Sequence, residues 1–154
     1  MKTINAVTLD EHTVVRRAEH IESERLAAIR DLLADNFFSL KQKKKQGDYA
    51  LHLKVAEQRL VIEVVDSKSG EKQEILVPLK PFKTLIRDYF MVCESYFEAM
   101  QSANHTRIEA IDMGRRGIHN EASELLRQYL AREVETDLDT ARRLFTLICV
   151  LHIK

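Results

Sequence analysis

The sequence predicts a single α+β domain over residues 1–154: a small antiparallel sheet (a meander) covered on one face by several helices, with a buried C-terminal helix. Strand patterns cluster between Phe37 and Leu79, and most helical patterns follow them without the βαβ alternation of a parallel sheet. The end of the chain supplies a second observation. From Leu144 to Leu151 every residue except Thr146 is apolar, so a helix there has no polar face and belongs in a core. The run is too short to cross a bilayer, which takes about twenty residues.

The N-terminal part is predicted to hold one strand and one helix. β-Branched and apolar residues indicate a short strand over Thr3–Leu9. The polar segment Asp10–Ala18 is expected to run over the surface. From about Glu19 to Asp35, apolar residues recur with the 3.6-residue period of a helix.

Alternation of apolar and polar residues predicts the sheet. The predicted strands are Phe37–Lys41, Tyr49–Val55, Leu60–Val64 and Ile75–Leu79. A tight connection through Ala56–Arg59 makes the second and third an antiparallel hairpin. Asp66–Gly70 has the chemistry of another hairpin turn, in which the glycine takes a positive φ. Pro78 has no amide donor, so the last strand is expected at a sheet edge.

The second half of the chain is predicted to be mainly helical. The predicted helices are 82–101, 118–131 and 138–152, with a brief extended link at Val134–Thr136. The aromatic stripe of Phe82–Met100 has helical spacing, which is more typical of core than of a ligand site. Thr106–Glu109 has the form of a capping box and starts a further helix. At the glycines of residues 113–117 either that helix bends or two short helices meet. Asp137 or Asp139 is expected to cap the last helix.

Composition excludes some classes of protein. Twenty-four basic residues balance twenty-four acidic ones, so the electrostatic footprint of a general nucleic-acid or membrane-surface binder is missing. Cys93 and Cys149 stand alone in apolar surroundings, which is typical of reduced cysteines; a disulfide between them is the weaker alternative. The first residues lack the apolar region of a signal peptide. We therefore expect a cytoplasmic protein with neither a membrane nor a nucleic acid as partner.

The densest polar group lies in one short stretch. Its candidate ligand-binding residues are Asp112, Arg115, Arg116, His119 and Glu121. In a continuous helix, Asp112, one of the arginines and His119 share a face at spacings of three, four and seven. If the helix instead breaks at Gly117, the exposed amides of a new helix beside two arginines form an anion site. The functional interpretation is a phosphate or carboxylate pocket, with His119 as a candidate acid or base.

A structural interpretation of the same residues carries more weight, because polar clusters are often structural networks. In it, the glycines set a helix junction and His119 fills a polar corner. The arginines then pair with Asp112, Glu121 or Glu124.

Other patterns are weaker. Arg142 and Arg143 fall in the first turn of the terminal helix, where positive charge is unfavourable without a partner, and one of them is expected to reach the same polar cluster. No metal or cofactor is predicted, because HExxH, CxxC, GxGxxG and GxxxxGK[ST] are all missing. His20 and Glu24 are more typical of an exposed helical pair than of metal ligands. The lysine run Lys41–Lys45 is typical of a solvated tip, with an acidic partner or RNA as the weaker alternative.

Three strings are long and specific: PFKTLIRDYFMVCESY (Pro81–Tyr96), IEAIDMGRRGIHNEASE (Ile108–Glu124) and DTARRLFTLICVLHIK (Asp139–Lys154). On these strings the chain resembles a family of small uncharacterised proteins found mainly in alphaproteobacteria. The resemblance runs over nearly the whole length; it departs at Ile153, where the family often has tryptophan, and in the lysine run. It implies a bacterial cytoplasmic setting and no particular activity, cofactor or catalytic residue.

From the sequence we expect a non-enzymatic interaction or regulatory module, because no recognised catalytic spacing is present. The alternative is a small-molecule enzyme or a phosphate- or carboxylate-binding protein that uses the cluster MGRRGIHNE (113–121), so whether the chain is an enzyme stays open. The partners expected are accordingly a protein, a second copy of the chain or a small anion. An open cleft shared by Arg116 and His119 favours the alternative, whereas their burial or salt bridging favours the first.

Overall fold

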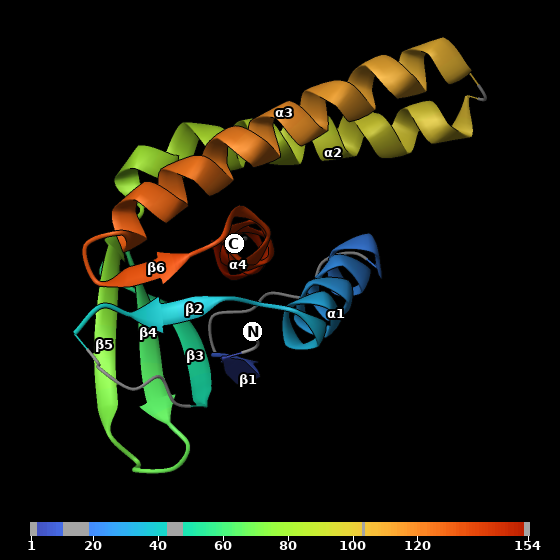
Figure 1. Cartoon of the computed structure of the whole chain (residues 1–154). Coiled ribbons are helices and arrows are strands. Elements are labelled where there is room, and N and C mark those ends of the chain that lie inside the picture. Colours follow the sequence, from blue (N-terminus) through green and yellow to red (C-terminus); the bar gives the residue numbers. More distant parts are fainter. Residues whose placement is uncertain (1–2, 11–18, 43–47, 103, 153–154) are drawn as a thin grey trace.

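The computed structural model describes residues 3–10, 19–42, 48–102 and 104–152 (Figure 1). Its helices are α1 (Glu19–Ala34), α2 (Lys83–Gln101), α3 (His105–Leu130) and α4 (Leu138–His152), with a 3-10 turn at Lys80–Phe82 before α2. Its strands are β1 (Ile4–Leu9), β2 (Phe38–Leu40), β3 (Tyr49–Ala56), β4 (Arg59–Asp66), β5 (Lys72–Pro78) and β6 (Val134–Thr136). The predicted α+β class is confirmed. Residues 11–18 of the predicted surface connection and 43–45 of the lysine run lie outside the described residues.

The main sheet is mixed, with strand order β1-β3-β4-β5. β3, β4 and β5 form the predicted antiparallel meander, and β5 is the edge strand that Pro78 indicated. β1, however, pairs parallel with β3, so the prediction of a purely antiparallel sheet was wrong. The chain between β1 and β3 includes α1, and a crossover of this kind is what a parallel pair requires. β2 does not join this sheet; it pairs antiparallel with β6, the predicted extended link.

The buried side chain of Asn36 joins the end of α1 to β1. Its Oδ1 accepts hydrogen bonds from the backbone N–H groups of Thr3 and Ile4, both at 2.8 Å. Its Nδ2 donates to the carbonyls of Ile4 at 2.9 Å and Leu32 at 2.8 Å. Both donors and both acceptor positions of the amide are therefore used, which fixes where β1 starts relative to α1.

The two predicted hairpin turns are present. Glu57 and Gln58 join β3 to β4 with φ values of 52° and 61°, the double positive φ of a turn that matches the twist of a hairpin. Gly70, in the turn between β4 and β5, has a φ of 77°, as its position in the sequence predicted.

Helix α3 is continuous through both glycines of the MGRRG run. Gly114 and Gly117 are exposed, and open space lies where a Cβ would be, so neither marks a junction. The anion site predicted for a broken helix is therefore ruled out. α3 begins earlier than the predicted capping box: Asn104 is its N-cap and accepts a hydrogen bond from the Arg107 N–H at 3.1 Å. Thr106 lies within the helix because asparagine is as good a cap as threonine.

The terminal helix α4 occupies the centre of the domain, between the sheet, α1 and α3 (Figure 1). Asp137 accepts a hydrogen bond from the Thr140 N–H at 2.8 Å and caps it, as predicted. Leu144, Phe145 and all residues from Leu147 to Leu151 are buried, so the prediction of a core helix is confirmed.

The α2–α3 hairpin runs past the rest of the domain (Figure 1). The aromatic stripe Phe82–Met100 is therefore core only towards its N-terminal end: Phe82, in the 3-10 turn before α2, and Tyr89 of α2 are buried, whereas Met100 is exposed. Cys93 of α2 and Cys149 of α4 are buried free thiols, as expected. None of the helices in the described part of the chain combines the length and the apolar character needed to span a membrane.

Candidate functional site

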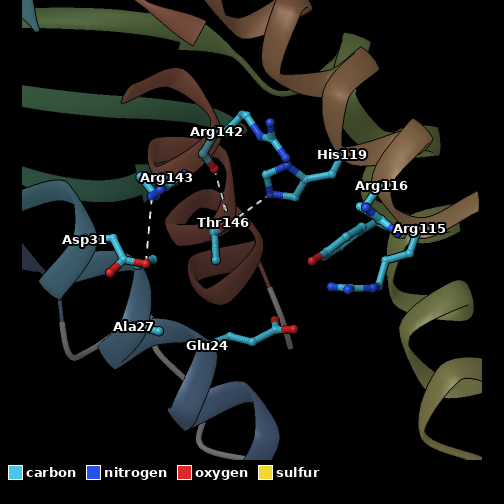
Figure 2. Close-up of a pocket in the computed structure, with 11 residues that line it drawn as sticks. Glu24, Ala27, Asp31, Arg115, Arg116, His119, Arg142, Arg143 and Thr146 are labelled. Carbon is cyan, nitrogen blue, oxygen red and sulfur yellow. Dashed lines mark hydrogen bonds and ion pairs between the residues drawn. The ribbon is translucent and has the colours of Figure 1, made fainter. Parts of the chain in front are cut away.

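A cavity of about 360 Å³ opens where α1, α3 and α4 meet (Figure 2). Its lining comes from Glu24, Ala27, Ala28 and Asp31 of α1, Tyr89 of α2, Arg115, Arg116 and His119 of α3, and Arg142, Arg143 and Thr146 of α4. The volume falls within the range typical of small-molecule sites. Four arginines on two neighbouring helices give most of one side of this cavity a positive charge.

The structure brings together part of the group that the sequence singled out. Arg115, Arg116 and His119 line the cavity, because a continuous α3 places spacings of three and four on one face. Asp112 lies one turn earlier and is not part of the lining, although it contacts both arginines. Glu121 is exposed and lies outside the lining.

Asp112 holds Arg115 and Arg116 through separate carboxylate oxygens. Arg115 binds Oδ1 through Nε at 3.1 Å and also through a terminal nitrogen, and Arg116 binds Oδ2 at 2.8 Å. The hydrogen bond from Arg115 is the main reason that the pKa of Asp112 lies below its usual value. The Arg115 guanidinium also lies 5.0 Å from the centre of the Tyr96 ring, in a cation–π contact. This arrangement matches the structural interpretation, in which the arginines pair with a neighbouring carboxylate.

His119 is a neutral link between α3 and α4. Burial, followed by the charges of Arg142, Arg115 and Arg143, lowers its pKa to about 4. Its Nε2 lies 2.8 Å from the Thr146 hydroxyl, which donates to the Arg142 carbonyl at 3.2 Å. Because that hydroxyl proton is used, we assign the hydrogen atom of the imidazole to Nε2.

Two aromatic rings pack against His119. The centroids of Tyr89 and Phe145 lie 5.3 Å and 5.2 Å from that of His119. Ser123 lies 3.4 Å from Nδ1, but its hydroxyl donates to the His119 carbonyl at 2.6 Å and is buried. The hydroxyl is therefore engaged with the backbone rather than activated by the imidazole as a nucleophile.

Arg142 and Arg143 are the fifth and sixth residues of α4 and face the same cavity. Arg143 lies 4.0 Å from Asp31 of α1. Within the described part of the chain, no carboxylate oxygen lies within ion-pair distance of Arg142, and its side chain makes no hydrogen bond. Neither arginine contacts Asp112, so the expected contact with that carboxylate is not made. Arg142 and Arg143 instead line the same cavity as Arg115, Arg116 and His119.

Sequence reasoning missed the α1 side of the cavity. Glu24, Ala27 and Asp31 follow one another at spacings of three, four and seven, which places them on one face of α1. The sequence shows this spacing, but the spacing does not indicate which face of α1 packs against α4. Among the described residues, no group of three or more histidine, cysteine, aspartate or glutamate side chains is placed to hold a metal.

Comparisons with known proteins support the family resemblance. The model of an uncharacterised protein family, UPF0262, matches residues 1–154. UPF0262 protein Rru_A2770 of Rhodospirillum rubrum is 50% identical over 148 residues, which cover 96% of this chain and 91% of that protein. UPF0262 protein amb3341 of Paramagnetospirillum magneticum is 49% identical over 148 residues, covering 96% and 94%. No solved structure matches the chain. The chain therefore belongs to the uncharacterised protein family UPF0262, with relatives in alphaproteobacteria.

Proposed function

We propose that this protein is a non-enzymatic module that binds a small phosphate- or carboxylate-bearing molecule in the cavity between α1, α3 and α4. The observation that carries this proposal is Arg142, a half-buried cation that lines the cavity without a carboxylate partner among the described residues. Guanidinium groups bind phosphates and carboxylates through paired, charge-assisted hydrogen bonds.

The charges around Arg142 favour an anion in the cavity. Arg142 immediately precedes Arg143 and follows the capped first turn of α4, near the helix end where the dipole disfavours a cation. Arg116 lies on the facing helix, and its side chain remains 62% exposed even while it contacts Asp112. An anion placed between these arginines would relieve their repulsion and gain hydrogen bonds from both α3 and α4.

Binding rather than catalysis is favoured by the state of the candidate reactive groups. His119 is neutral and its Nε2–H is committed to Thr146, and the Ser123 hydroxyl is committed to the backbone. Burial raises the pKa of the Cys93 thiol to about 11, which keeps it un-ionised and weakly nucleophilic. A reduced compartment suits two free buried thiols, and we propose the cytoplasm as the location.

Titration calorimetry with inorganic phosphate and with acetate tests the proposal. We expect at least one of these anions to bind the wild-type protein and Arg142→Gln to weaken that binding by about 10- to 100-fold, because a charge-assisted hydrogen bond contributes about 1.5–3 kcal/mol. Arg107→Gln is the matched control: it removes the same charge from an exposed position on α3, about 12 Å along that helix from the lining residue Arg115, and should bind as the wild type does. Equal affinities for the Arg142 variant and the wild type would refute the proposed site.

A protein partner or a homodimer stays a prediction without an assigned surface. Met91 and Met100 of α2 are exposed by 59% and 53%. They are nine residues apart, which is about two and a half turns, so they lie on opposite sides of the helix. These two methionines therefore do not form one apolar face for a partner.

A further inference from the structure

The arginines on the α3 side of the cavity are only partly neutralised. Arg115 and Arg116 share the one carboxylate of Asp112, with Arg115 on Oδ1 and Arg116 on Oδ2 at 2.8 Å. Two guanidinium groups and one carboxylate leave one positive charge in excess. Arg115 is also held against the ring of Tyr96. Arg116, whose side chain is 62% exposed, is therefore the arginine of this pair that is better placed to contact a ligand.

The α4 side of the cavity adds a second positive charge. Arg142 has no carboxylate within ion-pair distance among the described residues, whereas Arg143 lies 4.0 Å from Asp31 of α1 and is offset by it. His119 adds no charge near pH 7, because burial lowers its pKa to about 4. The side formed by α3 and α4 keeps a positive excess even when the full negative charge of Glu24, on the α1 side, is set against it (Figure 2).

A positive excess favours the more negative of two ligands that have the same shape. A carboxylate and a phosphate diester each carry one negative charge. A phosphate monoester carries about 1.5–2 negative charges at pH 7 and has three terminal oxygen atoms that accept hydrogen bonds. Arg116 and Arg142 stand on two different helices, so a group with three acceptor oxygens suits them better than a group with two.

We propose that the ligand is a small phosphate monoester, bound as the dianion, with its terminal oxygens shared between Arg142 of α4 and Arg116 of α3. The inference rests on the proposed function, because it selects one chemical class from the phosphates and carboxylates proposed for this cavity. The organic part of the ester lies against Ala27 and Ala28 of α1, whose small side chains leave room for it in a cavity of about 360 Å³.

Methyl phosphate and methyl sulfate test the assignment of a dianion. Both have one methyl group and three terminal oxygens, but at pH 8 methyl phosphate carries one more negative charge, because the second pKa of a phosphate ester is about 6. Each is titrated calorimetrically into the wild-type protein and its variants. We expect the wild type to bind methyl phosphate about tenfold more tightly. This is the lower end of what a charge-assisted hydrogen bond contributes, because the side chain of Arg116 is largely exposed.

Variants of Arg116 locate the source of this preference. Arg116→Gln should lose most of the preference while still binding methyl sulfate through Arg142. Arg116→Lys keeps the positive charge and should keep part of the preference. Arg107→Gln removes a charge from an exposed position outside the cavity lining and should keep all of it. Circular dichroism of each variant establishes that it is folded before these comparisons.

The outcomes separate the two proposals. If the wild type binds methyl sulfate as tightly as methyl phosphate, or if Arg116→Gln keeps the tenfold preference, the dianion held by Arg116 is overturned. The anion site itself still stands in that case if Arg142→Gln weakens the binding of both ligands. Tighter binding of acetate than of methyl phosphate would show that the ligand class is a carboxylate, which also overturns the monoester. If neither methyl ester binds the wild type and phosphate and acetate also fail, both proposals fall.

Discussion

Replacing His119 with glutamine should make the stability of the protein less sensitive to acid. In the folded chain, burial and the nearby arginines lower the pKa of His119 to about 4, against about 6.5 when the chain is unfolded. Between these pH values the unfolded chain carries a proton on His119 that the folded chain does not. The stability associated with the neutral ring is therefore fully present above about pH 6.5, and it is lost as the pH falls towards 4.

The size of the effect follows from the same interval. A change in pKa from 6.5 to about 4 corresponds to about 3 kcal/mol, at about 1.4 kcal/mol for each tenfold change in proton affinity. His119 is partly exposed, so we expect solvent to reduce the measured value to about 2 kcal/mol. In a chain of 154 residues this corresponds to a difference of roughly 4–8 °C in the melting temperature.

Urea unfolding at pH 7, 6, 5 and 4 measures this contribution as a difference between two proteins. Carboxylates such as Asp112 titrate in both the wild type and His119→Gln, so their contributions cancel. The wild type should lose about 2 kcal/mol more than the variant between pH 7 and pH 4. His105→Gln, which removes an exposed histidine at the start of α3, should behave as the wild type does. If the free energy of unfolding changes with pH in the same way for the wild type and for His119→Gln, the argument that the fold keeps the His119 ring neutral is refuted.

Three further changes test other parts of the structure. Asn36→Ala leaves the buried N–H groups of Thr3 and Ile4 without acceptors and should lower the free energy of unfolding in urea by about 2–5 kcal/mol; a loss below 1 kcal/mol would contradict the role of Asn36. Ala27→Leu fills the cavity without changing its charge and should weaken phosphate binding by about tenfold in calorimetry, with unchanged circular dichroism. Asp112→Asn removes a negative charge beside the cavity and should strengthen phosphate binding by about threefold; weaker binding would mean that Asp112 positions the arginines for the ligand.

Much of the fold was readable from local patterns. The meander follows from period-two alternation and from turn residues such as Gly70, and the core helix follows from the apolar run of Leu144–Leu151. These features are set by neighbours in sequence, so a pattern can report them. The parallel pairing of β1 and the departure of β2 to meet β6 could not be read in this way. Both depend on contacts between distant segments, such as those that Asn36 makes with β1.

The same distinction between local sequence patterns and contacts of distant segments applies to the candidate site. The sequence by itself determined that Asp112, Arg115, Arg116 and His119 share one side of a helix, because their spacing requires it. Only the tertiary structure decided that a cavity lies beside them and that α1 and α4 complete it. It also decided that Asp112 satisfies the α3 arginines while Arg142 keeps no such partner among the described residues. The physical reason is that ion pairs and cavities form wherever helix faces meet, and the way these faces meet is set by packing over the whole core.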